Sequence, residues 1–461
     1  MKEKLAFAGT AFLLCLLILP TRGDEQERKW RTPEGRFWVG TLVDVNGDRI
    51  SLRMPDGTQG NISLAKLGEP DQRYIARYVA EKAEAAELGP EQIAQEKKLA
   101  ATLSEGPRNW TSSDGKAIQG QLEGFDGSTV QLRTPRGVFK FPADRLSPLD
   151  QRLLRRWVED QPVQVGEWPD FVEAPDNMEI EFVDGGVEGW EFVYRSSHFE
   201  FRTTTRLSIS VVREFARIFE ATFEVVKALP VGFNPKPREG GYFLTELYET
   251  RNQYYAAGGP AGSGGVFMGG ANKIMIPLPN LGVKQVGNRW ILESGADSTT
   301  LQHEITHQVT FRWLSQWPVW FIEGLAEYIS SARYNKGRYT LKNMAGNVED
   351  AIMKYPVDGN SFPMVPVETL MTMDHGTWSA ALTGGGATYN YRSSNALMFY
   401  FLHLDGEGDG SGVATFLHAL NQGVPSRTAL AEHLLRGRDF AALSQEVETK
   451  LKQEGIRIEY R

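Results

Sequence analysis

The first third of the sequence repeats one unit, and this duplication limits the folds that the chain can adopt. Each copy begins with an Arg-x-Trp pattern, at Arg28 and Arg108, and each closes with Asp-Gln, at Gln72 and Gln151. The matched pairs between these ends are Gly40 and Gly120, Leu42 and Leu122, Gly47 and Gly127, Leu52 and Leu132, and Gly57 and Gly137. A repeat of this size predicts two small domains of the same fold.

Each copy has the pattern of short β-strands. Residues 38–43 and 129–133 alternate apolar and polar side chains, and Asn-Gly or Asp-Gly pairs at 46–47, 56–57 and 126–127 predict tight hairpin turns. We expect five such strands to form a small barrel in each copy.

The first residues have the composition of an export signal. A short charged start is followed by an apolar run over residues 5–19. A small-residue site for cleavage of the signal then lies near Gly23. The run is short for a membrane span, and no later stretch is apolar enough to cross a bilayer. Cleavage would remove Cys15, the only cysteine, which would exclude a disulfide framework and a cysteine nucleophile. An uncleaved signal that acts as a membrane anchor is the alternative.

At 461 residues the chain is too long for a single hydrophobic core, so several domains are expected. Its 50 basic and 58 acidic residues include no basic run, which argues against nucleic-acid binding. The predicted domains are a signal peptide at 1–23, a first barrel at 24–73, a helical linker at 74–105, a second barrel at 106–160 and a larger domain at 175–461.

The larger domain is predicted to mix strands and helices. Strands are expected at 190–194, 198–203, 242–244 and 273–277, and helices at 211–229, 347–354, 367–373, 395–403, 413–420 and 440–451. His198 stands before a strand, where a structural role is expected. No ligand-like partners accompany His375, His403, His418 and His433.

Residues 303–307 read His-Glu-Ile-Thr-His. On a helix, positions i and i+4 lie on one face, so His303 and His307 can offer imidazole nitrogens to one tetrahedral Zn²⁺. Glu304 would then stand beside the metal as a general base. An N-cap at 297–298 and an apolar stripe at helical spacing support a helix here. Ordinary surface histidines are the alternative for so short a pattern.

A second helix is predicted just after this motif. Pro318 suits its first turn, and Glu323 and Glu327 then fall one turn apart on the same face. A zinc enzyme requires a third protein ligand and an open fourth position for water. A solvated helix face is the alternative explanation for the two carboxylates.

Together, His-Glu-x-x-His and the Trp-Phe-x-Glu-Gly-Leu-Ala-Glu-Tyr run at 320–328 resemble the gluzincin metallopeptidases, in particular the bacterial secreted peptidase-MA-like families. The resemblance implies His303, His307 and Glu323 as zinc ligands, with Glu304 as catalytic base. Glu327 would hold the ring of His303 by a hydrogen bond. The spacing from His307 to Glu327 matches the thermolysin group, so Glu327 is the alternative third ligand.

The same resemblance suggests further parts of an active site. Tyr391 opens an apolar helix where related gluzincins carry a tyrosine, and it would donate a hydrogen bond to the oxyanion, with Tyr389 as the alternative. The Gly-x-Met-Glu-Asn element of aminopeptidases is missing, which favours an endopeptidase. The glycine-rich segment 256–270 is expected to be either a mobile lid or a surface loop.

The duplicated unit resembles the Sla homology domain of endocytic adaptors, a small SH3-like barrel that also occurs near the N-termini of exported bacterial proteins. In adaptors this module binds short peptide motifs. We expect a peptide or cell-envelope partner for the barrels, with a spacer or surface-attachment role as the alternative. The expected fold class is multidomain: two small all-β SH3-like barrels, then an α+β zincin-like metallopeptidase domain with a helical C-terminal part.

These expectations combine into an exported, periplasmic or extracellular zinc metallopeptidase that cleaves peptide or protein substrates. The alternative from another class is a non-enzymatic peptide-binding or protein-binding molecule, in which the tandem SH3-like domains recognise a partner and the zincin fold is an inactive scaffold. A narrower alternative keeps the enzyme and replaces the substrate with peptidoglycan cross-links or small esters.

Overall fold

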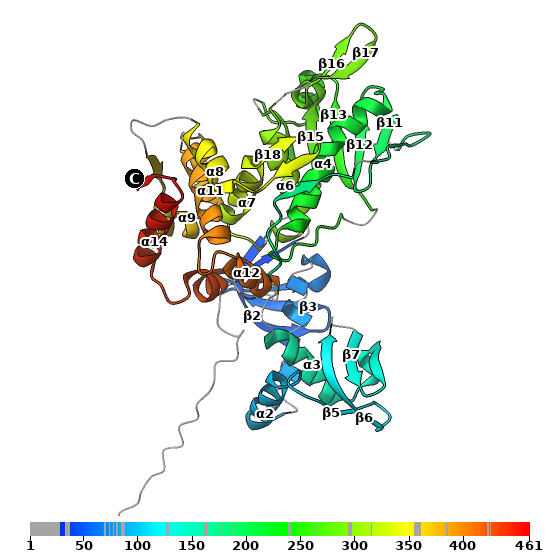
Figure 1. The fold of residues 1–461 in the computed structure, drawn as a ribbon, viewed down its shortest axis with the longest axis vertical. Coiled ribbons are helices and arrows are strands. Elements are labelled where there is room, and N and C mark those ends of the chain that lie inside the picture. Colours follow the sequence, from blue (N-terminus) through cyan, green and yellow to red (C-terminus); the bar gives the residue numbers. More distant parts are fainter. Residues whose placement is uncertain are drawn as a thin grey trace, which may run out of the picture.

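The structure is a computed structural model that describes residues 28–461 with short gaps (Figure 1). The residues left out of this range are 33–36, 69–70, 73, 77, 80–81, 84–87, 126–128, 161–164, 176, 188, 238–240, 262, 294–296, 315, 355–360, 384–385, 422–423 and 425. The expected signal peptide at 1–23 lies outside the described residues. Within them, no helix is both long and apolar enough to span a membrane.

Each copy of the duplicated unit forms a four-stranded antiparallel sheet whose strands follow in chain order. The first β-unit contains β1 (Arg28–Arg31), β2 (Phe37–Asn46), β3 (Arg49–Arg53) and β4 (Gln59–Ser63). The second β-unit contains β5 (Arg108–Thr111), β6 (Ala117–Phe125), β7 (Thr129–Thr134) and β8 (Gly137–Pro142).

The expected fifth strand is replaced in both units by a short 3₁₀ helix, η1 (Leu64–Lys66) or η2 (Ala143–Arg145). The N–H of Leu67 donates to the carbonyl of Leu64, and the N–H of Leu146 donates in the same way to Ala143, both at 3.0 Å. Because these i+3 bonds tighten the chain into a turn, it leaves the strand ladder at this point. In the second unit Leu146, directly after η2, makes one isolated antiparallel bridge with Ser112 rather than a full strand. The prediction of five strands is therefore wrong by one for the described part of each unit.

A buried tryptophan and a glycine make the same contact in both units. Trp30 and Trp110 are fully buried, and each donates its indole N–H to a glycine carbonyl, that of Gly40 or Gly120, at 2.9 Å. A Cβ atom on Gly40 would lie 2.8 Å from the carbonyl oxygen of Arg53 on the next strand. Only glycine permits this close approach, which explains the paired tryptophans and glycines of the repeat.

An ion pair ties the start of each unit to its end. Arg28 contacts Asp71 at 2.6 Å, Arg108 contacts Asp150 at 2.8 Å, and both carboxylates are buried. The glutamine after each aspartate donates to a leucine carbonyl, at 2.8 Å and 2.7 Å. The Arg-x-Trp opening and Asp-Gln closing patterns thus hold the two ends of one small domain together.

Two helices accompany the second β-unit. They are α2 (Pro90–Ala101) and α3 (Pro148–Asp160). Glu96 on α2 is buried and lies 2.9 Å from Arg152 and 3.4 Å from Arg156 on α3. The hydrogen bond from Arg152 is the main cause that lowers the pKa of Glu96. Ala100 and Leu103 join the core of this unit, so this half of the expected linker packs as part of the second unit.

The larger domain contains a six-stranded sheet in the order β10-β11-β12-β13-β15-β14. Its strands are β10 (Glu181–Phe182), β11 (Phe192–Arg195), β12 (Phe199–Thr203), β13 (Phe243–Tyr248), β14 (Val266–Met268) and β15 (Lys273–Pro277). β12, β13 and β15 run parallel, and β14 is an antiparallel edge strand. The strands and the long helix predicted in this region are confirmed.

Helices α4 (Ile209–Ala228) and α6 (Thr299–Leu314) share one core with the sheet (Figure 1). Phe199 of β12 meets Phe219 of α4 with ring centroids 5.3 Å apart, and Ile305 of α6 is fully buried in the same core. Ser208 caps α4 by accepting a hydrogen bond from the N–H of Val211. The sheet thus gives α6 a rigid support.

The C-terminal part is helical. Its helices are α7 (Val319–Ser331), α8 (Met344–Met353), α9 (Val367–Thr372), α10 (His375–Thr383), α11 (Ala387–His403), α12 (Ser411–Asn421), α13 (Ser426–Ala429), the π-helical turn η4 (Leu430–Leu435) and α14 (Phe440–Gln453). The five helices predicted here are confirmed within α8, α9, α11, α12 and α14, whereas α10 was not predicted. An N-terminal β-rich region is therefore followed by an α+β part and a helical part.

Several short elements complete the fold. They are β9 (Phe171–Glu173), α5 (Arg251–Ala256), η3 (Leu278–Leu281), β16 (Val283–Val286), β17 (Arg289–Leu292), β18 (Arg333–Asn335), β19 (Arg338–Thr340), β20 (Phe362–Met364) and β21 (Ile458–Tyr460). β20 pairs with β21, which returns the end of the chain to the segment between α8 and α9.

A buried carboxylate stabilises the C-terminal helices. Asp405 has a side chain only 1% exposed and contacts Arg436 at 2.5 Å and Arg438 at 2.9 Å. We expect Asp405→Ala to lower the free energy of unfolding by about 3 kcal/mol, because it leaves guanidinium groups without their buried partner. Chemical denaturation measures this loss. Glu407→Ala, an exposed change in the same loop, is the control, and equal stability of the two variants would contradict the prediction.

Candidate metal centre

Helix α6 places His303 and His307 on one face, one turn apart. Asp297 starts the helix by accepting hydrogen bonds from the N–H of Thr299 at 3.0 Å and from its hydroxyl at 2.8 Å. The backbone hydrogen bond from Thr299 is the main cause that lowers the pKa of Asp297. A Gln308 side chain donates to the carbonyl of Leu244 on β13 at 2.6 Å, so the helix is tied to the sheet directly after the second histidine.

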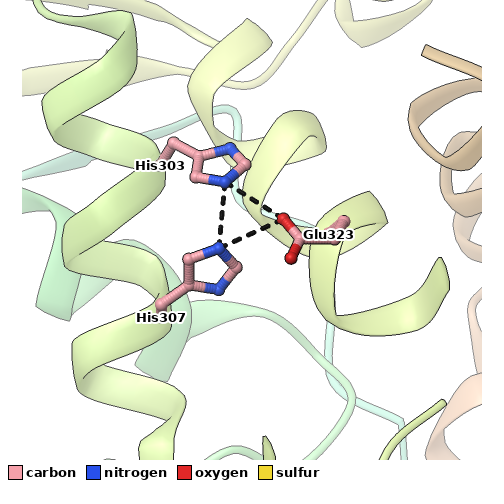
Figure 2. A group of neighbouring side chains, drawn as sticks. All are labelled: His303, His307 and Glu323. Carbon is pink, nitrogen blue, oxygen red and sulfur yellow. Dashed lines mark hydrogen bonds and ion pairs between the residues drawn. The ribbon is translucent and has the colours of Figure 1, made fainter. Parts of the chain in front are cut away.

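Three donor atoms converge between α6 and α7 (Figure 2). The Nε2 atoms of His303 and His307 lie 2.9 Å apart, and Glu323 Oε2 lies 3.2 Å from the first and 3.3 Å from the second. The structure therefore brings together the three residues that the resemblance implied as metal ligands.

The spacing of these atoms fits a metal ion. Three ligand atoms about 2.1 Å from a tetrahedral Zn²⁺ lie about 3.4 Å from one another. Glu323 Oε2 is buried and makes no hydrogen bond despite its closeness to both rings. A buried carboxylate oxygen without a hydrogen bond is costly, and a cation bound between the three atoms would satisfy it.

Glu327 has a different place from Glu323. Its Oε1 lies 3.0 Å from Nδ1 of His303, on the other side of the ring from Nε2. A carboxylate there accepts a hydrogen bond from the Nδ1–H group. The proton then stays on Nδ1, and the lone pair of Nε2 is free to bind a metal. This geometry argues against Glu327 as the third ligand, because Glu327 contacts Nδ1 of His303, on the side of the ring away from the other two donor atoms.

Neighbouring charges favour the ionised forms of His303 and Glu323. Burial opposes a charge on His303, yet Glu323 and Glu327 outweigh it and raise the pKa of His303 well above its ordinary value. Burial likewise opposes the Glu323 carboxylate, and the two histidines outweigh it and lower the pKa of Glu323. A raised pKa on His303 means that a metal competes with a proton for this ring.

Glu304 lies next to His303 on α6 and faces the edge of the sheet. Its Oε2 accepts a hydrogen bond from the backbone N–H of Phe267 on β14 at 2.8 Å. This donor could not be found from the sequence, because a backbone N–H carries no residue-specific signal. The expected general base is therefore anchored by the edge strand.

Tyr391 also belongs to the centre. Its ring lies 5.9 Å from that of His303 and stands edge-on to Trp378 at 5.3 Å. Burial, followed by the charge of Glu323, raises the pKa of Tyr391. The alternative, Tyr389, lies elsewhere.

Two other candidates from the sequence have structural contacts. Tyr389 stacks on Phe362 with centroids 6.4 Å apart, and the guanidinium of Arg461 lies 4.2 Å from its ring. His198 contacts the buried Glu220 at 2.6 Å through Nδ1, which agrees with the structural role expected for it.

A glycine allows the ligand-bearing helix to approach α11. A Cβ atom on Gly324 would lie 2.6 Å from the carbonyl oxygen of Ser394. We expect Gly324→Ala to push α7 away from α11, to lower the free energy of unfolding by about 1–3 kcal/mol, and to weaken metal binding through the neighbouring Glu323. Thermal denaturation and metal titration measure the two effects. Gly376→Ala, whose Cβ would have ordinary contact distances, is the control; equal behaviour of both variants would contradict the prediction.

Comparison with models of known protein families gave no match, and comparison with curated proteins gave no relative. The assignment of a function therefore depends on the residues and their geometry.

Proposed function

We propose that this protein is an exported zinc metallopeptidase of the gluzincin type. The observation that carries the proposal is the convergence of His303 Nε2, His307 Nε2 and Glu323 Oε2. Glu304 follows His303 on the same helix, and its carboxylate is held by the N–H of Phe267. Two imidazoles and one carboxylate are ligands suited to Zn²⁺, whereas Ca²⁺ and Mg²⁺ prefer oxygen ligands. The proposed metal is therefore zinc.

The side chains of the centre divide the chemistry among them. When bound, zinc supplies a water molecule of lowered pKa and an electrophile for the scissile carbonyl. Glu304 takes a proton from the attacking water and passes it to the leaving amine. Tyr391 donates a hydrogen bond to the developing oxyanion. Glu327 keeps the Nδ1 proton of His303 in place.

An extended peptide is the proposed substrate. β14 is the edge strand of the sheet and is linked to Glu304 through Phe267. Glu304 occupies the N–H of Phe267 on this edge. The rest of the edge can hydrogen-bond to an extended chain, which would lay a scissile bond beside the base. A substrate held along its backbone on both sides of the cut suits an endopeptidase.

The experiment combines metal analysis with cleavage. The purified protein is expected to contain one zinc per chain, to hydrolyse a mixed peptide library, and to lose this activity in a chelator and regain it with zinc. Peptidoglycan cross-links and small esters are offered in parallel. If the protein hydrolyses only the peptidoglycan cross-links or the esters, these become the proposed substrates in place of peptides. If the metal-free protein cleaves peptides at an unchanged rate, the proposal is wrong.

The second β-unit, which we propose to be an SH3-like Sla homology domain, gives some support to the alternative of a binding protein through its edge strand β8. Val138 and Phe139 are adjacent on β8, so they point to opposite faces of the strand, and they are 45% and 44% exposed. Gln59 and Gly60 take the same ladder positions in the first β-unit. Because that unit makes the same sheet without them, the two apolar side chains are not required by the fold.

An extended acidic peptide that pairs with the edge of β8 would meet both apolar side chains, and exposed Arg136 and Lys140 flank them. Fluorescent peptides with and without acidic residues provide the test. The double change Val138→Gln and Phe139→Gly, which copies the first β-unit, is expected to lower binding at least about tenfold without changing metal content. Unchanged binding would reject this edge as the binding site.

A further inference from the structure

The glycine-rich segment that was expected to be a lid or a loop is fastened to its surroundings. Buried Tyr254 on α5 donates its hydroxyl to Ser263 Oγ at 2.5 Å, and Ser263 donates to the carbonyl of Pro260 at 3.0 Å. A Cβ atom on Gly259 would lie 2.3 Å from the Tyr254 ring. The backbone at Gly259 thus rests on the face of this ring, which no larger residue allows.

A second attachment comes from η3. Asn280 donates from Nδ2 to the carbonyl of Gly264 at 2.7 Å, and Arg251 donates to Asn280 Oδ1 from Nε at 3.3 Å and from Nη2 at 3.1 Å. The arginine fixes which way the amide points. A Cβ atom on Gly265 would lie 3.1 Å from a side-chain carbon of Ile276 on β15. We call Ser263, Gly264 and Gly265 the glycine strap.

The glycine strap leads directly to the hydrogen bond on Glu304. Val266, the next residue, packs against the buried cluster that contains Tyr254 and Met275. Phe267 follows, pairs with Ile274 on β15, and gives its N–H to Glu304 Oε2 at 2.8 Å. Any movement of the glycine strap would therefore move this donor.

We propose that Asn280 and the glycine strap are positioning residues for Glu304, because they fix the backbone N–H that holds one oxygen of its carboxylate. This inference rests on the proposed function. A glutamate side chain is flexible, and ordering it costs conformational entropy. A fixed donor on Oε2 limits that freedom before substrate arrives and leaves Oε1 as the oxygen that accepts the proton of water.

Asn280→Asp removes the donor to Gly264 while keeping the size of the side chain and an acceptor for Arg251. Hydrogen exchange followed by mass spectrometry is expected to be at least about tenfold faster over residues 263–268, because the glycine strap opens more often. The kcat on a peptide substrate is expected to fall about tenfold, with KM within about twofold and zinc content unchanged. Tyr254→Phe keeps the ring and loses one hydrogen bond. It is expected to speed hydrogen exchange and to lower kcat, each by less than Asn280→Asp does.

Asn288→Asp introduces the same charge at an exposed turn and is the matched control. Wild-type exchange and kcat in Asn280→Asp would overturn the inference, and so would faster exchange with an unchanged kcat. A wild-type protein that binds zinc and cleaves no peptide would overturn the proposed function instead. The exchange measurement would in that case still decide whether Asn280 holds the donor at Phe267.

Discussion

Glu304→Gln is expected to keep zinc and to lose at least about 1,000-fold in kcat, within the range that a general base contributes. The amide has the shape of the carboxylate, and its oxygen can still accept the hydrogen bond from the N–H of Phe267. It cannot take a proton from water at neutral pH. Because Glu304 is not among the three converging ligands, zinc affinity is expected to stay within about threefold of the wild-type value.

Initial rates on a fluorogenic peptide and metal analysis of the same sample measure the two expectations together. Glu368→Gln, an exposed glutamate in the first turn of α9, makes the same chemical change away from the centre and should have no effect. A Glu304→Gln variant with the wild-type rate would remove the role of this residue as a base. Loss of zinc with activity would instead make Glu304 part of the metal site.

The parts of the centre that the sequence predicted are those that depend on local geometry. His303 and His307 lie one helical turn apart, so a helix alone brings their rings together, and 2.9 Å separates their Nε2 atoms. Glu323 and Glu327 also lie one turn apart, and local geometry alone does not choose between them. The choice follows from how α7 packs on α6, which turns Glu323 to Nε2 and Glu327 to Nδ1 of His303.

Contacts that backbone atoms make, and contacts between segments far apart in the chain, could not be predicted from the sequence. The N–H of Phe267 meets Glu304 only because β14 folds back along β15, and any residue but proline would offer the same donor. Trp378 lies on α10, which has no clear apolar periodicity and was not predicted. In the β-units the repeat was readable partly because some matched positions make the same contact in each unit, as Trp30 does with Gly40 and Trp110 with Gly120.

Glu323→Ala and Glu327→Ala are expected to separate a metal ligand from the residue that orients one. Loss of a hydrogen-bond partner of a ligand typically lowers metal affinity 10- to 100-fold, and we expect about this loss for Glu327→Ala. Glu323→Ala should exceed about 100-fold, because it removes one of three bonds and leaves two imidazoles that cannot by themselves fill a structured zinc site. Competition with a chelator of known zinc affinity measures both losses at one pH, since protons compete with zinc for these side chains.

Glu368→Ala controls for the loss of an exposed carboxylate, and His303→Ala gives the value for the loss of a proposed imidazole ligand. We expect His303→Ala and Glu323→Ala to lose similar amounts of zinc affinity. The loss in Glu327→Ala should lie between theirs and that of the control. If Glu327→Ala loses zinc while Glu323→Ala retains it, the ligand is Glu327 and α7 must turn when the metal binds. Such a turn would have to carry Glu327 from Nδ1 of His303 to the side where both Nε2 atoms lie. It would also break the close contact between Gly324 and Ser394, which should lower the stability of the fold. A zinc-bound protein whose fold is as stable as before would therefore argue against the turn.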